Sequence, residues 1–125
     1  MCFHGHVLVF SLGPHIIREF LELDEAIKSN VRYYIEDKPE EYIIYAELPG
    51  VRKDSVEVYV APHGLLVKAK PSIKLPWMPE VYRLKVKFGS EIDRERTKAK
   101  YKDGILIINV PKKSKAVKIQ VEGIS

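Results

Sequence analysis

The sequence has little of three things: cysteine, amide side chains and long apolar runs. A single cysteine, Cys2, in 125 residues excludes a disulfide framework and indicates a reducing compartment. No apolar stretch approaches the roughly 20 residues that span a membrane. Residues 7–10 lack the basic flank and the small-residue cleavage site of a signal peptide. We therefore predict a cytoplasmic protein.

The scarcity of amides is the second compositional feature. Gln120 is the only glutamine, and Asn30 and Asn109 are the only asparagines. Together with many lysines, glutamates and isoleucines, this composition resembles that of heat-adapted proteins and suggests a thermophile. The charges, 21 basic and 17 acidic, are interspersed rather than blocked, so the net charge of +4 permits an acidic partner without requiring one.

The motifs of an enzyme are also missing. There is no glycine-rich phosphate loop, and no nucleophile stands beside a credible base, so we predict neither an enzyme nor a cofactor. Possible metal ligands are Cys2, His4, His6 and His15. They crowd the N-terminus without a second paired motif, and we predict no metal site.

Two basic rows raise the possibility of nucleic-acid binding. Lysines and an arginine alternate with apolar residues at Arg83, Lys85 and Lys87, and again at Lys98, Lys100 and Lys102. A basic sheet face binds single strands when aromatic side chains lie on the same face. Here the aromatics Tyr82, Phe88 and Tyr101 fall on the opposite faces, where we expect them to enter a core, so nucleic acid is not the predicted partner.

Residues 14–30 contain the one helical pattern. Apolar side chains recur at helical spacing from Pro14, which suits a first turn, to Ser29 and Asn30, which suit a stop. The stripe consists of Ile16, Ile17, Phe20, Leu21, Leu23 and Ile27. We predict an N-terminal arm, residues 1–30, with an irregular start over 1–13 followed by this amphipathic helix.

After residue 30 the period changes to two, which is typical of β-strands. Alternating segments recur at intervals of about ten residues with turn signals between them, which favours an all-β, immunoglobulin-like antiparallel sandwich. The predicted strands cover residues 31–36, 42–48, 56–60, 65–70, 82–88, 97–101, 105–110 and 117–121. Residues 71–80 contain three prolines around Trp77 and are predicted to be a loop.

One predicted strand, residues 105–110, is apolar at nearly every position. A strand in a two-layer sandwich normally buries one face and exposes the other. Ile105, Leu106, Ile107 and Ile108 leave almost no face for water. This pattern predicts apolar surface that something else must cover.

Two motifs resemble the α-crystallin domain of the small heat shock proteins. Residues 46–58 read AELPGVRKDSVEV, and residues 99–106 read AKYKDGIL, followed by Val110 and Pro111. The motif turn residues are Pro49, Gly50, Gly104, Ile105 and Leu106. The resemblance implies an α-crystallin-like sandwich over residues 31–112, between the arm and a C-terminal tail, residues 113–125.

The resemblance also implies a function. Proteins of this family are ATP-independent holdases that form dimers or larger homo-oligomers and hold unfolding client proteins. The tail carries an I-x-I-like element, Val117, Ile119 and Val121, which in the family adds to an apolar groove of a neighbouring subunit. The implied groove residues are Val56, Val58, Val60, Ala99 and Tyr101. The N-terminal stripe would serve assembly and client binding.

Alternatives remain open at three points. The tail element also reads as a last strand packed on its own domain. The 71–80 loop is shorter than the segment that some family members exchange between subunits, so the mode of dimerisation is undetermined. A CS-type co-chaperone domain, a monomeric adaptor for one folded partner, is the alternative function.

Overall fold

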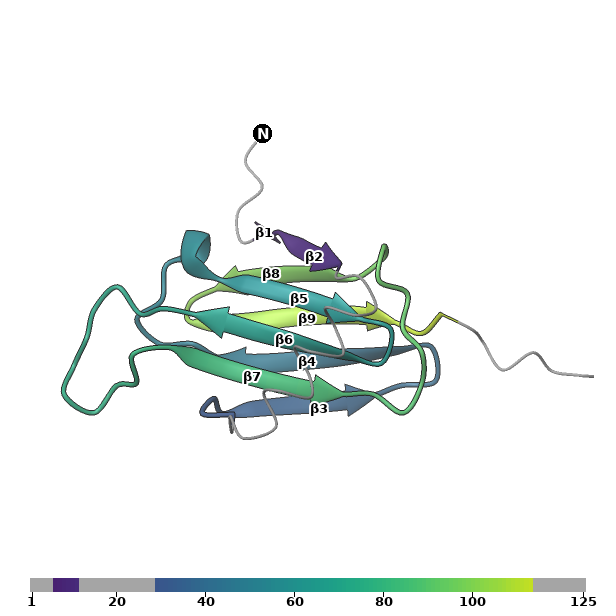
Figure 1. The fold of residues 1–125 in the computed structure, drawn as a ribbon, viewed down its shortest axis with the longest axis horizontal. Coiled ribbons are helices and arrows are strands. Elements are labelled where there is room, and N and C mark those ends of the chain that lie inside the picture. The colour runs from purple at the N-terminus through teal and green to yellow at the C-terminus, as the bar shows by residue number, and fades with distance from the viewer. Residues whose placement is uncertain (1–5, 12–28, 114–125) are drawn as a thin grey trace, which may run out of the picture.

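Two β-sheets lie face to face in the computed structural model, which describes residues 6–11 and 29–113 (Figure 1). The five-stranded sheet has the order β1-β8-β9-β4-β3, and the four-stranded sheet has the order β2-β5-β6-β7. Every pairing is antiparallel except β2 with β5. The predicted all-β sandwich is confirmed.

The strands follow the predicted alternation closely from residue 33 onward. They are β3 (Tyr33–Asp37), β4 (Glu41–Glu47), β5 (Glu57–Ala61), β6 (Gly64–Ala69), β7 (Tyr82–Lys87), β8 (Lys98–Lys102) and β9 (Ile105–Pro111). Residues 71–80 contain no strand, as predicted. The predicted helix over 16–27 and the predicted strand over 117–121 lie outside the described residues.

The prediction of an irregular start over residues 1–13 is wrong at residues 6–11. These residues form two short strands, β1 (His6–Val7) and β2 (Val9–Ser11), one in each sheet. The alternation of apolar residues here is too short to distinguish a strand from a loop in the sequence. These residues become strands because they pair with the edges of β8 and β5.

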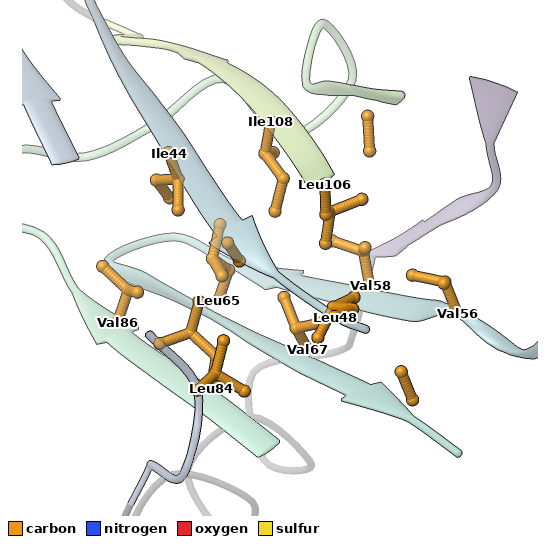
Figure 2. Packing of buried hydrophobic residues seen from close by; sticks show 14 of the residues in the cluster. Ile44, Leu48, Val56, Val58, Leu65, Val67, Leu84, Val86, Leu106 and Ile108 are labelled. Carbon is orange, nitrogen blue, oxygen red and sulfur yellow. The ribbon is translucent and has the colours of Figure 1, made fainter. Parts of the chain in front are cut away.

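The core lies between the two sheets and is built from one face of every long strand. Buried side chains from the two layers point toward each other (Figure 2). The largest that are fully buried are Ile44, Leu48, Val58, Val60, Leu65, Val67, Leu84, Ile92, Leu106, Ile108 and Val110. Tyr82, Phe88 and Tyr101 are buried as predicted, which leaves the basic residues of their strands facing outward.

Strand β9 does not present the bare apolar face that its sequence suggests. Leu106, Ile108 and Val110 are buried in the core, and Ile105 and Ile107 on the outer face are half-buried. Ile107 lies between Lys100 and Tyr45 on the neighbouring strands, and the long side chains of these neighbours flank it. None of the large exposed apolar residues belongs to β9, so the expected uncovered surface lies elsewhere.

The two motif glycines occupy tight turns that require a left-handed backbone. Asp103 and Gly104 join β8 to β9 in a two-residue loop with φ of 53° and 81°, a combination typical of a type I′ hairpin. Gly50 has φ of 77° in the connection after β4. The Gly104 carbonyl accepts a hydrogen bond from the Leu48 amide, which ties the two motif turns together.

Candidate functional site

One side of the sandwich is formed by the outer edges of β5 and β8, which belong to different sheets. We call this side the β5–β8 seam. Its inward-facing residues are those that the family resemblance implies for a groove: Val56, Val58, Val60, Ala99 and Tyr101. All five are buried as part of the core, and residues 6–11 lie along the two edges of the seam (Figure 1).

Residues 6–11, the N-terminal segment, pair with both edges of the seam in turn. His6 and Val7 lie opposite Lys100 and Ala99 of β8 in antiparallel register. Three residues further on, Val9–Ser11 pair in parallel with residues 58–60 of β5. The segment therefore crosses from one sheet to the other within a few residues and closes this side of the domain.

The side chains of the N-terminal segment alternate between the core and the solvent. Val7 and Val9 are half-buried and pack against the core, whereas Leu8 between them is 76% exposed. Phe10 points to the outer face of the four-stranded sheet and stacks on Tyr59, with 5.6 Å between ring centroids. Partial burial is the larger cause that raises the pKa of Tyr59, and the hydrogen bond from its hydroxyl to Glu57 raises this pKa further.

Tyr101 connects the seam to the turn of the first motif. Its hydroxyl lies 2.8 Å from the carbonyl oxygens of both Leu48 and Val51, which flank the Pro49–Gly50 turn. Burial raises the pKa of Tyr101, since the charged phenolate loses hydration. The single hydroxyl proton is shared between the two carbonyl oxygens, and the Leu48 carbonyl also accepts from the Val51 amide.

A second apolar site lies where the 71–80 loop projects beyond the ends of the strands (Figure 1). It is a cavity of about 380 Å³ lined by Pro49, Gly50, Ile73, Leu75, Trp77, Met78, Pro79 and Tyr82. Trp77 is 78% exposed, and Ile73 and Leu75 are also exposed. The sequence interpretation missed this site, although the apolar alternation at residues 73, 75 and 77 signals it.

A third apolar area follows the free edge of β3. Tyr33 and Tyr34 are exposed beside a cavity of about 400 Å³ that is also lined by Arg32, Tyr45, Ala46, Glu47 and Ile105. The Tyr45 hydroxyl donates a hydrogen bond of 2.8 Å to Glu36, and this bond raises the pKa of Tyr45. The site is rich in aromatics but contains no nucleophile beside a base.

The edge strand of the four-stranded sheet on the side away from the seam, β7, is protected by side chains. Asn30 donates from its amide nitrogen to the Val81 carbonyl at 2.9 Å and accepts from the Arg83 amide at 2.8 Å. The Ser29 hydroxyl accepts from the Lys85 amide at 3.0 Å. Side chains thus occupy the backbone groups through which an unrelated strand could pair with β7.

The two basic rows do not form one surface. Lys98, Lys100 and Lys102 lie exposed on the outer face of the five-stranded sheet. Arg83, Lys85 and Lys87 belong to β7 in the four-stranded sheet, whose outer face looks the other way. This separation offers no single track for a nucleic-acid backbone.

The part of the chain that is described holds no group of three histidine, cysteine, aspartate or glutamate side chains suited to a metal ion. Of the candidate ligands, Cys2, His4 and His15 lie outside the described residues, and His6 lies in β1. No helix among residues 6–11 and 29–113 has the length and apolar content to span a bilayer.

Comparisons with known proteins agree with this architecture. Residues 34–125 match the model of the Hsp20/alpha crystallin family. The small heat shock protein C4 of Rickettsia felis is 31% identical over 131 residues, covering 95% of this chain and 76% of that protein.

Solved structures share the fold at low sequence identity. Heat shock protein 16.0 from Schizosaccharomyces pombe matches 78% of this chain and all of its own, with a TM-score of 0.59 and 18% identity. HspA from Xanthomonas axonopodis matches 69% of this chain and 96% of its own, with a TM-score of 0.61 and 19% identity. The chain belongs to the Hsp20/alpha-crystallin family of small heat shock proteins, a family of non-enzymatic chaperones.

Proposed function

We propose that this chain is an ATP-independent holdase that covers exposed apolar segments of unfolding proteins and keeps them from aggregating. One observation carries the proposal. The exposed large apolar residues of the described part gather at the margins of a closed sandwich, in three places. These places are Leu8 and Phe10 on the N-terminal segment, Tyr33 and Tyr34 at β3, and Ile73, Leu75 and Trp77 on the 71–80 loop.

The apolar margins suit unfolding polypeptides better than one rigid partner. They lie on edges and on a projecting loop, and an extended client segment contacts such surfaces through alternate side chains and its backbone. Contiguous exposed apolar surface of this kind commonly marks a binding site. A CS-type adaptor would instead present one surface for one folded protein.

Assembly and tail docking belong to the same proposal. Residues 117–121 would add to the β5–β8 seam through Val117, Ile119 and Val121, and the apolar stripe of residues 16–27 would join other subunits or clients. The 71–80 loop is held to its own domain, because both the amide and the hydroxyl of Ser72 bond the Gly50 carbonyl. This anchoring favours assembly through surfaces other than exchange of the loop.

The proposal predicts that a single tail binds the seam with low affinity. Burying three branched side chains stabilises by about 1.5–3 kcal/mol each at most. Ordering about six residues costs roughly 1–2 kcal/mol apiece in backbone entropy. Because the two sums nearly cancel, useful affinity requires several tails at once, and heating uncovers seams without nucleotide.

The test is a light-scattering assay with a heat-labile client enzyme, at one subunit of this chain per client and without nucleotide. The expected result is suppression of client aggregation on heating, with the client retained in a complex on gel filtration. An equal amount of an unrelated β-sandwich protein is the control. Aggregation that proceeds as in this control would remove the proposal.

A monomer that binds one native protein and leaves heated clients unprotected would instead support the adaptor function. The predicted reducing compartment and heat-adapted source have separate tests. Fractionation of the source cells locates the protein, and a melting temperature well above that of a typical mesophilic domain would agree with a thermophile.

A further inference from the structure

The N-terminal segment occupies the seam through a very short ladder. β1 pairs two residues with β8, and β2 pairs three residues with β5. The other neighbouring strands pair over longer stretches, such as the seven register pairs between β4 and β9. A short ladder, two half-buried valines and the stacking of Phe10 on Tyr59 therefore hold residues 6–11 in place.

We propose that residues 6–11 are a displaceable occupant of the β5–β8 seam, and that the tail of a second copy, residues 117–121, enters the seam only when they leave. One seam then holds one segment at a time. The inference rests on the proposed function, because the tail docking proposed above is the step that residues 6–11 would control.

The fit of the two segments supports their exchange. In the seam Val7 lies opposite Ala99, Val9 lies opposite Val58, and Leu8 points to solvent. The tail has the same alternation of β-branched residues, with Lys118 and Gln120 between them. A docked tail would place a polar side chain where the N-terminal segment exposes a leucine, so the tail is the better match for the solvent side.

The direction of the segment identifies the tail as that of a second copy. β1 and β9 both run antiparallel to β8, so they point the same way. A tail that docks in the direction of β1 must therefore start level with the middle of β9. Ala99 lies level with Ile108, five residues before Lys113 along the strand direction, and the docked segment lies two strands away from β9. Placing Val117 opposite Ala99 therefore requires the chain to cover about 19 Å from Lys113. Four residues span at most about 14 Å. In this direction and register, the chain's own tail therefore falls short.

A reversible lock tests the exchange in the full chain. Phe10 and Tyr59 are register neighbours on the outer face, so Phe10→Cys and Tyr59→Cys with Cys2→Ser place two thiols within disulfide range. These changes remove the ring stacking but keep the core-facing residues of the seam. Oxidation pins residues 6–11, and reduction frees them. The single variant Cys2→Ser, with and without reductant, is the control for the reductant itself.

The readout is mass in solution, compared with a tail variant that carries Val117→Asp, Ile119→Asp and Val121→Asp. We expect the oxidised lock to fall to the mass of the tail variant and the reduced form to assemble like the Cys2→Ser control. If the oxidised lock stays assembled while the tail variant does not, the exchange is refuted and tail docking stands. If the tail variant also assembles, both are refuted.

Release of the segment gives an independent check. Val7→Asp with Val9→Asp places charges at two core-facing positions and should free the seam, while Leu8→Asp at the exposed position between them is the matched control. Amide hydrogen exchange at residues 117–121 should slow at least tenfold in the double variant and stay unchanged in the control. Equal exchange in both variants would overturn the inference. The client assay measures holdase activity separately.

Discussion

At the scale of single residues, the motif positions are explained by backbone geometry and by buried hydrogen bonds. Gly50 and Gly104 have positive φ, which glycine adopts without the steric cost of a side chain. Tyr101 adds a role that its motif position does not suggest, since its hydroxyl lies 2.8 Å from the carbonyl oxygens of Leu48 and Val51 beside the Pro49–Gly50 turn. Tyr101 thus stabilises the turn of the first motif as well as being a candidate groove residue.

Removing this hydroxyl should destabilise the domain. Tyr101→Phe keeps the ring in the core but removes the hydroxyl donor from the Leu48 and Val51 carbonyl oxygens, of which the Leu48 oxygen keeps the Val51 amide as a donor. The expected cost is about 1–3 kcal/mol in the free energy of unfolding. Urea denaturation measures the change. Tyr34→Phe, at an exposed position, is the matched control and should shift the free energy by less than about 0.5 kcal/mol.

The raised pKa of Tyr101 also predicts a dependence on alkaline pH. Because the folded pKa exceeds the unfolded value of 10.0, the unfolded chain loses this proton first as the pH rises. The contribution of Tyr101 is therefore complete below pH 10 and declines between 10 and the folded pKa. The unfolding free energy of Tyr101→Phe should fall less steeply above pH 10 than that of the unchanged chain, and parallel curves would contradict this assignment.

At the scale of elements, the edges of the sandwich differ in what covers them. The β5–β8 seam is covered by residues 6–11, the β7 edge is occupied by Ser29 and Asn30, and β3 is left with exposed tyrosines. Open edges invite pairing with other chains, so their protection governs where association takes place. Association through β7 is therefore disfavoured. The β3 edge exposes its tyrosines, and the seam becomes available only when residues 6–11 leave it.

The protection of β7 can be removed by one substitution. Asn30→Ala deletes the side-chain bonds to Val81 and Arg83 and should cost about 1 kcal/mol of stability, because both bonds are at an exposed edge. Faster hydrogen exchange of the Arg83 amide and greater self-aggregation on heating should accompany the loss. Asn30→Asp keeps the acceptor for the Arg83 amide and should preserve its protection. Equal exchange in both variants would contradict the edge role.

The 71–80 loop should contribute to client binding without contributing to stability. Replacing Ile73, Leu75 and Trp77 by serine removes exposed apolar surface, so the melting temperature should change by no more than about 2 °C. The amount of this chain needed to protect a heated client should rise several-fold. A matched set, Lys98→Ser, Lys100→Ser and Lys102→Ser, changes three exposed residues of the outer sheet face and should leave protection intact.

At the scale of the whole molecule, assembly is predicted to depend on the tail while the fold does not. The last described residue, Lys113, is anchored by an ion pair to Glu91 and by a backbone bond to the same residue. A chain that ends at Lys113 therefore keeps the sandwich. We expect its circular dichroism to be unchanged and its mass in solution to fall toward that of a monomer or dimer.

The control for this truncation is the full chain with Lys118→Ala and Gln120→Ala. These substitutions keep Val117, Ile119 and Val121, so the assembly should persist. Assembly of the truncated chain at full size would mean that the tail is not a contact between subunits. Disassembly of the control would mean that the polar positions, rather than the apolar ones, hold the subunits together.

The sequence by itself determined strands β3 to β9, the core and the motif turns. Alternation over five or six residues specifies which side chains are buried, as at β7 and β8, and the glycines at 50 and 104 specify where the chain reverses. Strand alternation and turn glycines are local properties, so they can be recognised in the sequence alone. The two motif matches added the family.

Only the tertiary structure decided what covers the seam and where the apolar surface is exposed. The outer face of β9 is flanked by side chains of its neighbours, which periodicity along one strand does not reveal. Residues 6–11 are too few to form a recognisable strand pattern, and their partners lie about 50 and 90 residues away along the chain. Their structure depends on two open edges that exist only after the sheets have packed together.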